Sequence, residues 1–274
     1  MKTSTTARLQ REHLQRHKLY SARIQRTFLV ALNKQVKEAS KKLPDVAAFQ
    51  RAINAISPLP VEIAYKSAYR SIVLDSGQIT LIEINKSIMQ KRHVFDASSY
   101  HKDWLTRLRE WIDTKGANRI NQITENTKSK LRDVINSTYQ DETITSNQER
   151  ATAIYKTIND PAYNRARSIT IARTETTTAA NLGHTIAADT LSDKLNMAMQ
   201  KTWIPTGDAR TRDAHEAMFL YPPVPSEQDF LVGGEDLAFP GDPRGSARNV
   251  VNCRCRVVYQ VVRDASGRIL PAAN

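Results

Sequence analysis

Residues 254–262 read RCRVVYQVV, which is the most strand-like run in the chain. Its β-branched and aromatic residues are of the types enriched in β-strands, namely Val257, Val258, Tyr259, Val261 and Val262. Thr202 to Ile204 forms a second short β-rich segment. Turn-forming residues surround both segments, because seven of the 11 prolines lie between Pro205 and Pro271. The chain after about residue 200 is therefore predicted to form a compact α+β module with long ordered loops.

The preceding two-thirds of the chain have the pattern of helices. Glycine is scarce, with 9 residues in 274, and apolar residues recur at helical spacing. The predicted helices are Ala7–Lys42 before Pro44, Asp45–Ile56, Val61–Leu74 closed by Asp75-Ser76-Gly77, Ile79–Met89, Ser98–Asp113 broken by Gly116, Asn118–Tyr139, Ser146–Ile158, and Ala162–Met199 with a break near Gly183 or Asp189. For Ile79–Met89 a strand is the alternative, because the segment carries β-branched residues without clean alternation. The expected fold class is α+β, with a mostly helical N-terminal two-thirds followed by the C-terminal module.

Three local signals refine this reading. Ser146 and Glu149 have the spacing of a capping box. Pro161 suits the first turn of the helix that follows it. The stripe from Tyr100 to Trp111 is interpreted as core packing and not as a ligand site. The predicted domains are a basic helical region over 1–160 with an arm over 1–42, a module over 161–265, and a tail over 266–274.

Positive charge is concentrated in the arm. The chain has a formal net charge of +12, and residues 1–42 contain 11 Lys and Arg against 2 Asp and Glu, a balance of +9. Such a segment attracts polyanions by neutralising phosphates and releasing counterions, although a solvated helix that keeps the protein soluble is the alternative. The candidate DNA-binding residues are Arg8, Arg11, Arg16, Lys18, Arg23, Arg26, Lys34 and Lys37.

Signals for export and membrane insertion are not evident. Residues 1–22 have charges throughout, without the apolar core of a signal peptide, and no apolar run approaches membrane-spanning length. Cys253 and Cys255 are separated by one residue, a spacing that is awkward for a mutual disulfide in an extended strand. We therefore expect synthesis in a reducing cytoplasm and no membrane partner.

The final third of the chain contains a series of short motifs. It begins with Ala172-Arg173-Thr174-Glu175 and Lys201-Thr202-Trp203, continues with Asp208-Ala209-Arg210-Thr211-Arg212-Asp213-Ala214-His215, Phe230 and Gly233-Gly234, and ends with Pro240-Gly241-Asp242-Pro243 and Asn252-Cys253-Arg254-Cys255-Arg256. In order and spacing these motifs resemble the Mu F-like family of phage head morphogenesis proteins, also called minor head or minor capsid proteins. The resemblance covers about residues 165 to 262. It departs from the family after His215, where relatives commonly have a glycine and this chain has Ala217-Met218-Phe219.

The resemblance implies a structural protein of the virion, assembled in the bacterial cytoplasm and built into the head of a tailed bacteriophage. Its expected partners are the portal, the major capsid protein or the scaffold protein near the portal or inner shell, and packaged double-stranded DNA, bound without sequence specificity. No enzymatic activity is expected. The structural motif residues are Arg173, Glu175, Trp203, Asp208, Arg210, Arg212, His215, Pro240, Gly241, Asp242, Asn252 and Arg254.

The charged residues around His215 can be interpreted in two ways. In the first, Asp208 caps a helix start and the surrounding charges form surface ion pairs. In the second, a fixed polar network joins this helix to residues 252–255. Two residues of the preceding helix are expected to form buried or half-buried ion pairs with this region. The expected pairs are Arg173 with Asp208, or Glu175 with Arg210 or Arg212.

The two cysteines also have more than one structural interpretation. On a strand, Cys253 and Cys255 face one side while Arg254 and Arg256 face the other. The thiols are then small core residues, or they bind a structural zinc ion with His215 and Asp208, or they have a redox or catalytic role. Core packing ranks first because the spacing is not the usual Cys-x2-Cys. No other cofactor is expected.

Two further functions remain as alternatives. The first is an effector enzyme, because the Arg…Glu pattern resembles ADP-ribosyltransferase-type toxins and the His and Cys set suits a metal-dependent hydrolase. Paired catalytic carboxylates and an HExxH motif are not found in the sequence. The second, a host DNA-binding protein, lacks a helix-turn-helix or zinc-finger pattern. Pro240-Gly241-Asp242-Pro243 is read as a rigid turn and not as a phosphate-binding loop.

Overall fold

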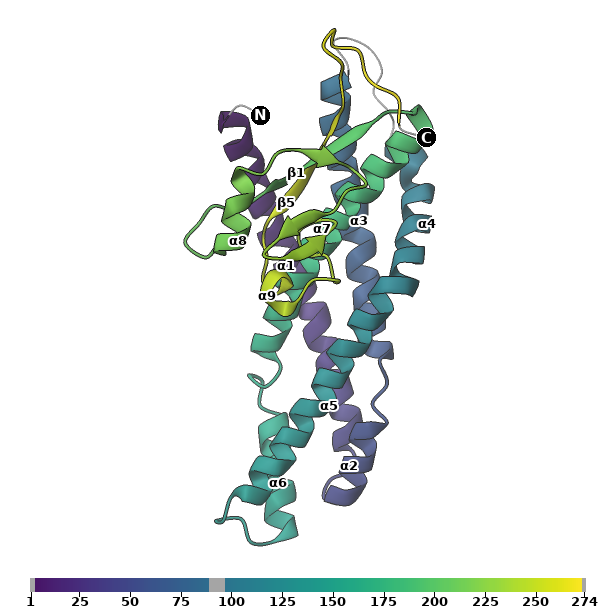
Figure 1. Cartoon of the computed structure of the whole chain (residues 1–274). Helices are drawn as coiled ribbons and strands as arrows, with labels where there is room; N and C mark the ends of the chain where they lie inside the picture. The colour runs from purple at the N-terminus through teal and green to yellow at the C-terminus, as the bar shows by residue number, and fades with distance from the viewer. Residues whose placement is uncertain (1–2, 89–96, 273–274) are drawn as a thin grey trace. The chain divides into compact units, whose positions relative to one another are not determined.

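The computed structural model describes residues 3–88 and 97–272 and has the α+β fold expected from the sequence (Figure 1). The chain forms two compact units, each assembled from separate segments. Unit 1 contains Met1–Ser21, Ala68–Ile112 and Arg173–Asn274, and unit 2 contains Ala22–Ser67 and Asp113–Ala172. This division into units differs from the boundary predicted at residue 160. The predicted boundary concerned functional domains, and it stays a prediction.

Helices dominate both units. The α-helices of the first 195 residues are α1 Thr3–Ser40, α2 Val46–Asn54, α3 Leu59–Ile88, α4 His101–Trp111, α5 Ala117–Gln140, α6 Asn147–Ile158 and α7 Arg165–Leu195. A 3-10 turn, Ala97–Tyr100, precedes α4, and a π-helical turn, Ile112–Gly116, follows it. Among the described residues, none of the helices has the length and apolarity needed to cross a membrane.

The predicted helix stop at Asp75-Ser76-Gly77 is wrong, because α3 continues through it. Gly77 lies where a Cβ atom would come within 2.9 Å of the Trp104 ring, so the glycine makes room for an aromatic side chain. Trp104 is fully buried, which confirms it as core. Met89, the end of the predicted 79–89 helix, lies outside the described residues.

The predicted breaks at Gly116 and near Gly183 are also wrong. Gly116 completes a π-helical turn that leads directly into α5. Gly183 lies inside the unbroken helix α7, where a Cβ atom would stand 2.7 Å from the carbonyl oxygen of Val73. The absence of a side chain thus allows α7 to pack closely on α3.

The start of α7 differs slightly from the prediction. Pro161 lies in a turn and α7 begins at Arg165, so the proline precedes the helix instead of occupying its first turn. The cap of α6 is confirmed. The Ser146 hydroxyl accepts from the Glu149 N–H at 3.1 Å, and the Glu149 carboxylate accepts from the Ser146 N–H at 2.9 Å.

Unit 2 is an all-helical assembly around an apolar core. The second half of α1 contributes Val36 and Ala39, and α2 contributes its buried face. Asp45 caps α2 by accepting from the Ala48 N–H at 2.9 Å. The remaining core comes from α5 and α6; the full set is Val36, Ala39, Val46, Phe49, Ile53, Ile56, Leu131, Ile135, Ala151, Ile154 and Ile158.

Unit 1 contains the β-structure. β1 (Met199–Ile204) pairs antiparallel with β5 (Arg256–Val261) and with the short β2 (Val224–Pro225), in the order β2-β1-β5. β3 (Phe230–Val232) and β4 (Glu235–Leu237) form a separate hairpin. The short helices α8 (Asp213–Glu216) and α9 (Ala247–Val250) and a 3-10 turn, Ala217–Phe219, lie in the loops. The two β-rich segments were therefore correctly predicted, although β5 begins at Arg256 and not at Arg254.

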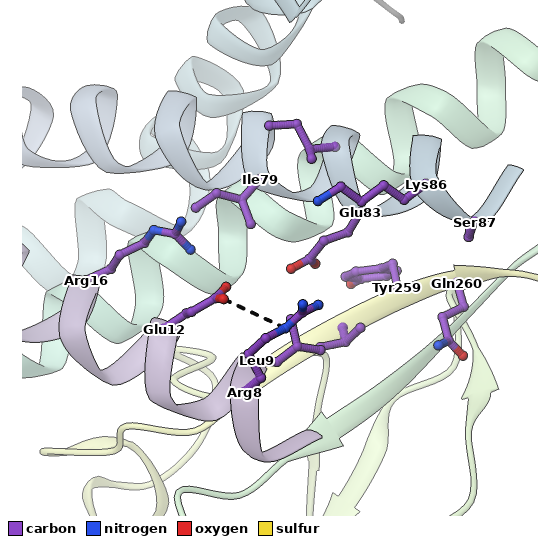
Figure 2. A pocket seen from close by; sticks show the side chains of 12 residues that line it. Arg8, Leu9, Glu12, Arg16, Ile79, Glu83, Lys86, Ser87, Tyr259 and Gln260 are labelled. Atoms are coloured by element: carbon purple, nitrogen blue, oxygen red, sulfur yellow. Dashed lines mark ion pairs between the residues drawn. The ribbon is translucent and has the colours of Figure 1, made fainter. Parts of the chain in front are cut away.

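The N-terminal half of α1 belongs to unit 1. Leu9 is buried in a small apolar cluster with Ile204 of β1 and Val258 of β5. Beside it lies a cavity of about 420 Å³, lined by charged residues of α1 and α3 together with Tyr259 (Figure 2). The predicted arm is therefore an integral helix and not a free extension. In the part of α1 that belongs to unit 2, Phe28 and Leu32 are buried as well.

Candidate metal centre and its polar framework

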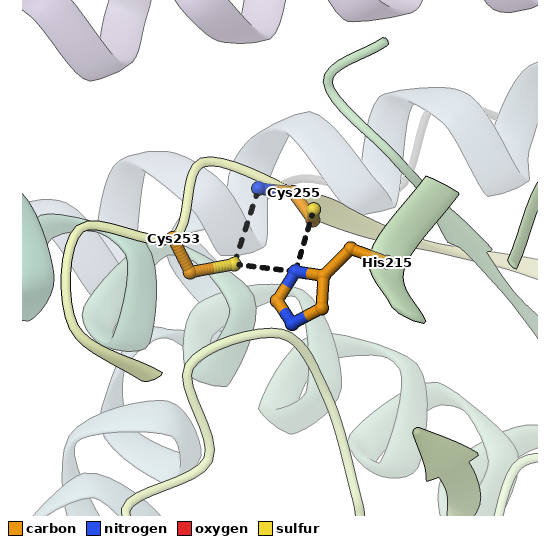
Figure 3. Close-up of side chains that lie close together, drawn as sticks. All are labelled: His215, Cys253 and Cys255. Carbon is orange, nitrogen blue, oxygen red and sulfur yellow. Dashed lines mark hydrogen bonds between the residues drawn. The ribbon is translucent and has the colours of Figure 1, made fainter. Parts of the chain in front are cut away.

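A histidine and two cysteines meet inside unit 1 (Figure 3). The Nδ1 atom of His215 lies 3.4 Å from the Sγ of Cys255 and 3.7 Å from the Sγ of Cys253. The three ligand atoms lie within 4.8 Å of one another, and all three side chains are buried. Both cysteines are free thiols. His215 thus forms one group with two cysteines that lie 38 and 40 positions further along the chain, and this group could hold a metal ion.

The ring of His215 is held by aromatic packing. His215 lies on the short helix α8 and packs edge-on against Trp203 of β1, with ring centroids 5.4 Å apart. Trp203 in turn packs edge-on against Phe230 of β3. The Nε2 atom of His215 is buried and has no hydrogen-bond partner among the described residues. Packing therefore directs Nδ1 towards the two sulfur atoms.

The two thiols differ in their readiness to ionise. A hydrogen bond from Cys253 is the largest influence that lowers the pKa of Cys255, followed by the contact with His215 and the backbone N–H of Thr206. The same thiol–thiol hydrogen bond, together with burial, raises the pKa of Cys253. Cys255 is therefore the thiol that ionises first, and a thiolate is the form that binds metals.

The spacing of this group fits a tetrahedral zinc site. With Zn–S near 2.3 Å and Zn–N near 2.0–2.1 Å, nitrogen and sulfur ligands of tetrahedral zinc lie roughly 3.5 Å apart. The two nitrogen–sulfur distances, 3.4 and 3.7 Å, are close to this value. Two thiols and one imidazole are also an ordinary zinc donor set. The group supplies three ligands, which leaves a fourth tetrahedral position.

Asp208 was predicted as a helix cap and as a zinc ligand, and the structure places it in neither role. Helix α8 begins at Asp213 and has Arg212 at its N-cap position. The Asp208 carboxylate instead accepts two hydrogen bonds from the Arg254 guanidinium, at 2.7 and 2.8 Å, and one from the Arg210 N–H at 3.1 Å. This bidentate pair lowers the pKa of Asp208 well below its ordinary value. The expected Arg173–Asp208 pair is thus replaced by Arg254–Asp208.

Two further contacts hold the segment before β5, one from the loop before α8 and one from α7. The Arg212 guanidinium donates to the carbonyl of Val251 at 2.5 Å. The N–H of Asn252, which has a positive φ of 57°, donates to the Thr174 hydroxyl at 3.0 Å. The polar network predicted between the His215 turn and residues 252–255 is therefore present.

Helix α7 presents a buried polar stripe to this region. The Thr177 hydroxyl bonds to the carbonyl of Cys253, and the Thr178 hydroxyl donates to the carbonyl of Gly241 at 2.7 Å. The Asn181 amide donates to the carbonyls of Pro240 at 2.8 Å and Cys255 at 3.1 Å, and its oxygen accepts from the Val257 N–H at 2.9 Å. One helix thereby holds the cysteine segment, the start of β5 and the Pro240 turn.

The predicted tight turn at Pro240-Gly241-Asp242-Pro243 is confirmed. Gly241 has a φ of 85°, which favours glycine. The Asp242 carboxylate accepts from the Arg244 N–H at 3.0 Å and from the Ala238 N–H at 2.8 Å, and the Arg244 guanidinium bonds it as well. This turn is a rigid loop that docks on α7.

The two predicted α7 residues have different environments. Glu175 is buried and accepts a hydrogen bond from the Tyr69 hydroxyl at 2.7 Å. Arg173 is exposed, and its carbonyl bonds the Nε2 of His17 in α1 at 3.1 Å. Of the eight predicted DNA-binding residues, Arg16 is half-buried and the others are exposed, so the structure leaves them accessible.

The polar contacts around the cysteine segment include residues that the sequence analysis did not single out. Asn181, Thr177 and Thr178 were not singled out, although polar residues at helical spacing within a helix next to strand-like sequence are a usable signal. Three buried histidines, His13, His17 and His184, were also missed. Burial is the main cause that lowers the pKa of all three, to about 4 for His17, and therefore keeps them neutral near pH 7.

A comparison of this chain with protein families, curated proteins and solved structures finds no match. The resemblance to the Mu F-like family therefore stays a prediction that depends on the motifs themselves.

Proposed function

We propose that this protein is a minor head protein of a tailed bacteriophage, in which unit 1 acts as an assembly joint. The proposal combines the family resemblance with one structural observation: the motifs that carry the resemblance contact one another. Asn252 bonds Thr174, Arg254 pairs with Asp208, and Cys253 and Cys255 meet His215. Their mutual contacts support a scaffold role for the motif residues.

The burial of the three candidate metal ligands supports a structural role for this group over a catalytic one. His215 is 1% exposed and both cysteines are 2% exposed. A substrate has to reach a catalytic metal, whereas a structural metal is enclosed and contributes to folding. We assign His215, Cys253 and Cys255 to a structural zinc ion that joins α8 to the segment before β5.

Contact with packaged DNA is the second part of this proposal. The exposed cations of α1 are available for phosphate contacts that need no base recognition. They lie on a helix with buried Leu9, Phe28 and Leu32, so deletion of residues 1–42 would remove part of the core. Substitution of the exposed cations is therefore the appropriate test.

Co-purification with procapsids tests the head-protein role. Full-length protein is expressed with the phage head proteins, and procapsids assembled with and without portal are isolated. We expect the protein in procapsids in a few copies each, with recovery that depends on portal or on the inner shell. Absence from both kinds of procapsid, with folded protein left in the soluble fraction, would overturn the proposal.

Native mass spectrometry tests the metal separately. We expect one zinc ion per chain, lost in His215→Ala and Cys255→Ser. Asp208→Asn is the matched control, because Asp208 lies outside the group and should leave zinc bound. Metal-free protein purified without chelator, or zinc retained by both ligand variants, would contradict the assignment.

A further inference from the structure

A second cavity of unit 1, of about 640 Å³, opens beside the polar joint. Its lining comes from sequence-distant segments: α1, the start of α7, the loop before α8 and the segment before β5. The charged side chains that line it are Lys18, Asp208, Arg173, Arg210, Arg212 and Arg254. The fold therefore gathers five cations and one carboxylate around one hollow.

The one carboxylate of this lining is already neutralised. Both Asp208 oxygens bond the Arg254 guanidinium, and Arg210 lies 3.6 Å away. Arg212 uses one donor on the Val251 carbonyl, and a guanidinium has five. Among residues 3–88 and 97–272, the Lys18 and Arg173 side chains form no ion pair.

The pKa of a histidine in the lining is also affected by these positive charges. His17 lines the cavity, and the guanidinium groups of Arg254 and Arg173 add to the main effect of burial in lowering its pKa to about 4. His17 is therefore neutral near pH 7, so the net charge of the lining is about +4. Like charges held together are unfavourable unless an anion offsets them.

The cavity in Figure 2 provides a contrast within the same unit. Its cations Arg8, Arg16 and Lys86 face two carboxylates, Glu12 and Glu83. Arg8 lies 3.8 Å from Glu12, and Glu83 bonds Arg256 at 2.5 Å. That cavity is nearly balanced in charge, whereas the cavity at Arg173 retains a positive excess.

We propose that the cavity lined by Lys18, Arg173, Arg210 and Arg212 is a binding site for a phosphate group. Planar guanidinium groups with free donors match phosphate oxygens, and converging cations supply the charge. The phosphate comes either from a nucleic-acid backbone or from a free phosphate compound. The site requires neither the zinc ion nor assembly into a head, and a DNA phosphate bound here would be one of the contacts proposed above for packaged DNA.

The test compares two double variants of the full-length protein. Arg173→Gln with Arg210→Gln removes two exposed cations of the cavity, while Lys130→Gln with Lys156→Gln removes two exposed cations that are not among the candidate DNA-binding residues. Circular dichroism checks that both variants fold. The probes are a labelled mixed-sequence DNA duplex, titrated at several salt concentrations, and inorganic phosphate and pyrophosphate, titrated by calorimetry.

For a DNA phosphate, we expect the cavity variant to bind the duplex about tenfold more weakly. The slope of log K against log salt should fall by about two, since each phosphate contact contributes about 0.9. For a free phosphate compound, calorimetry should show one site per chain that the cavity variant loses while duplex binding is unchanged. Equal losses in the two variants, or no loss of either probe in the cavity variant, would overturn the proposal.

Discussion

The two units are stabilised in different ways. The described core of unit 2 is a cluster of aliphatic residues and Phe49, packed between helices. The interior of unit 1 contains many buried polar groups, among them Thr177, Thr178, Asn181 and His215, bonded to carbonyls or directed at thiols. Apolar packing tolerates changes that preserve volume, whereas a buried polar group needs its partner at a defined position.

This difference indicates where the specificity of the protein lies. The motif segments of unit 1 are joined by directional hydrogen bonds, as at Asn181 and at the Asp208–Arg254 pair. A unit bonded in this way suits the proposed roles of assembly joint and phosphate-binding site. Unit 2 has fewer buried polar groups, of which Gln35 bonded to Thr124 and Thr127 is the main example, and depends more on matched apolar helix faces.

The largest expected effect is that of Asn181→Leu. The substitution keeps the volume approximately but leaves the carbonyls of Pro240 and Cys255 and the N–H of Val257 without their partner. Each buried group left unpaired costs about 1–3 kcal/mol, so we expect a loss of roughly 3 kcal/mol or more. Hydrogen exchange read by mass spectrometry should show faster exchange in residues 253–261 than in α6. Equal acceleration in both would contradict the proposed difference between the units.

Acid should destabilise unit 1 selectively. Unfolded histidine has a pKa near 6.5, and the pKa values of His13, His17 and His184 are lowered in the folded protein. The unfolded chain therefore takes up protons that the folded chain does not, and stability falls as the pH decreases below 6.5.

Between pH 6.5 and 5.5 each histidine should cost about 1 kcal/mol. Burial raises the pKa of Asp189 to about 6, and this carboxyl offsets part of the loss because its folded form gains a proton more readily. Urea unfolding at the two pH values measures the net change. Stability that rises on acidification would show that these histidines are not the dominant titrating groups.

A smaller effect is expected for Leu131→Met in unit 2. Leu131 is fully buried in the apolar cluster, and a volume-conserving exchange of this kind usually costs less than about 1.5 kcal/mol. Chemical denaturation of the full chain gives the value. A loss as large as that of Asn181→Leu would remove the contrast between the units.

The smallest effect should come from Ser146→Ala. This change removes the hydroxyl of an exposed capping box, and caps of this kind contribute about 1 kcal/mol. Exchange of the first amides of α6 should accelerate while β1 and β5 stay protected. Ser146→Asp serves as the control, since aspartate also caps helices.

The sequence alone determined the elements that depend on local interactions. Helix α6 follows from Ser146 and Glu149, α1 from its apolar spacing, and β5 from its β-branched run. The tight turn at Gly241 was predictable for the same reason. Each of these depends on residues only a few positions apart, so their pattern is readable without the fold.

Only the tertiary structure decided what the ambiguous residues do. Gly77 and Gly183 continue their helices because of Trp104 and Val73, which pack where a side chain would have stood. The carboxylate of Asp208 pairs with Arg254, 46 positions away, and does not cap the helix that follows it in the sequence. Glycine and aspartate have several conformations or partners of similar energy, and long-range packing selects among them.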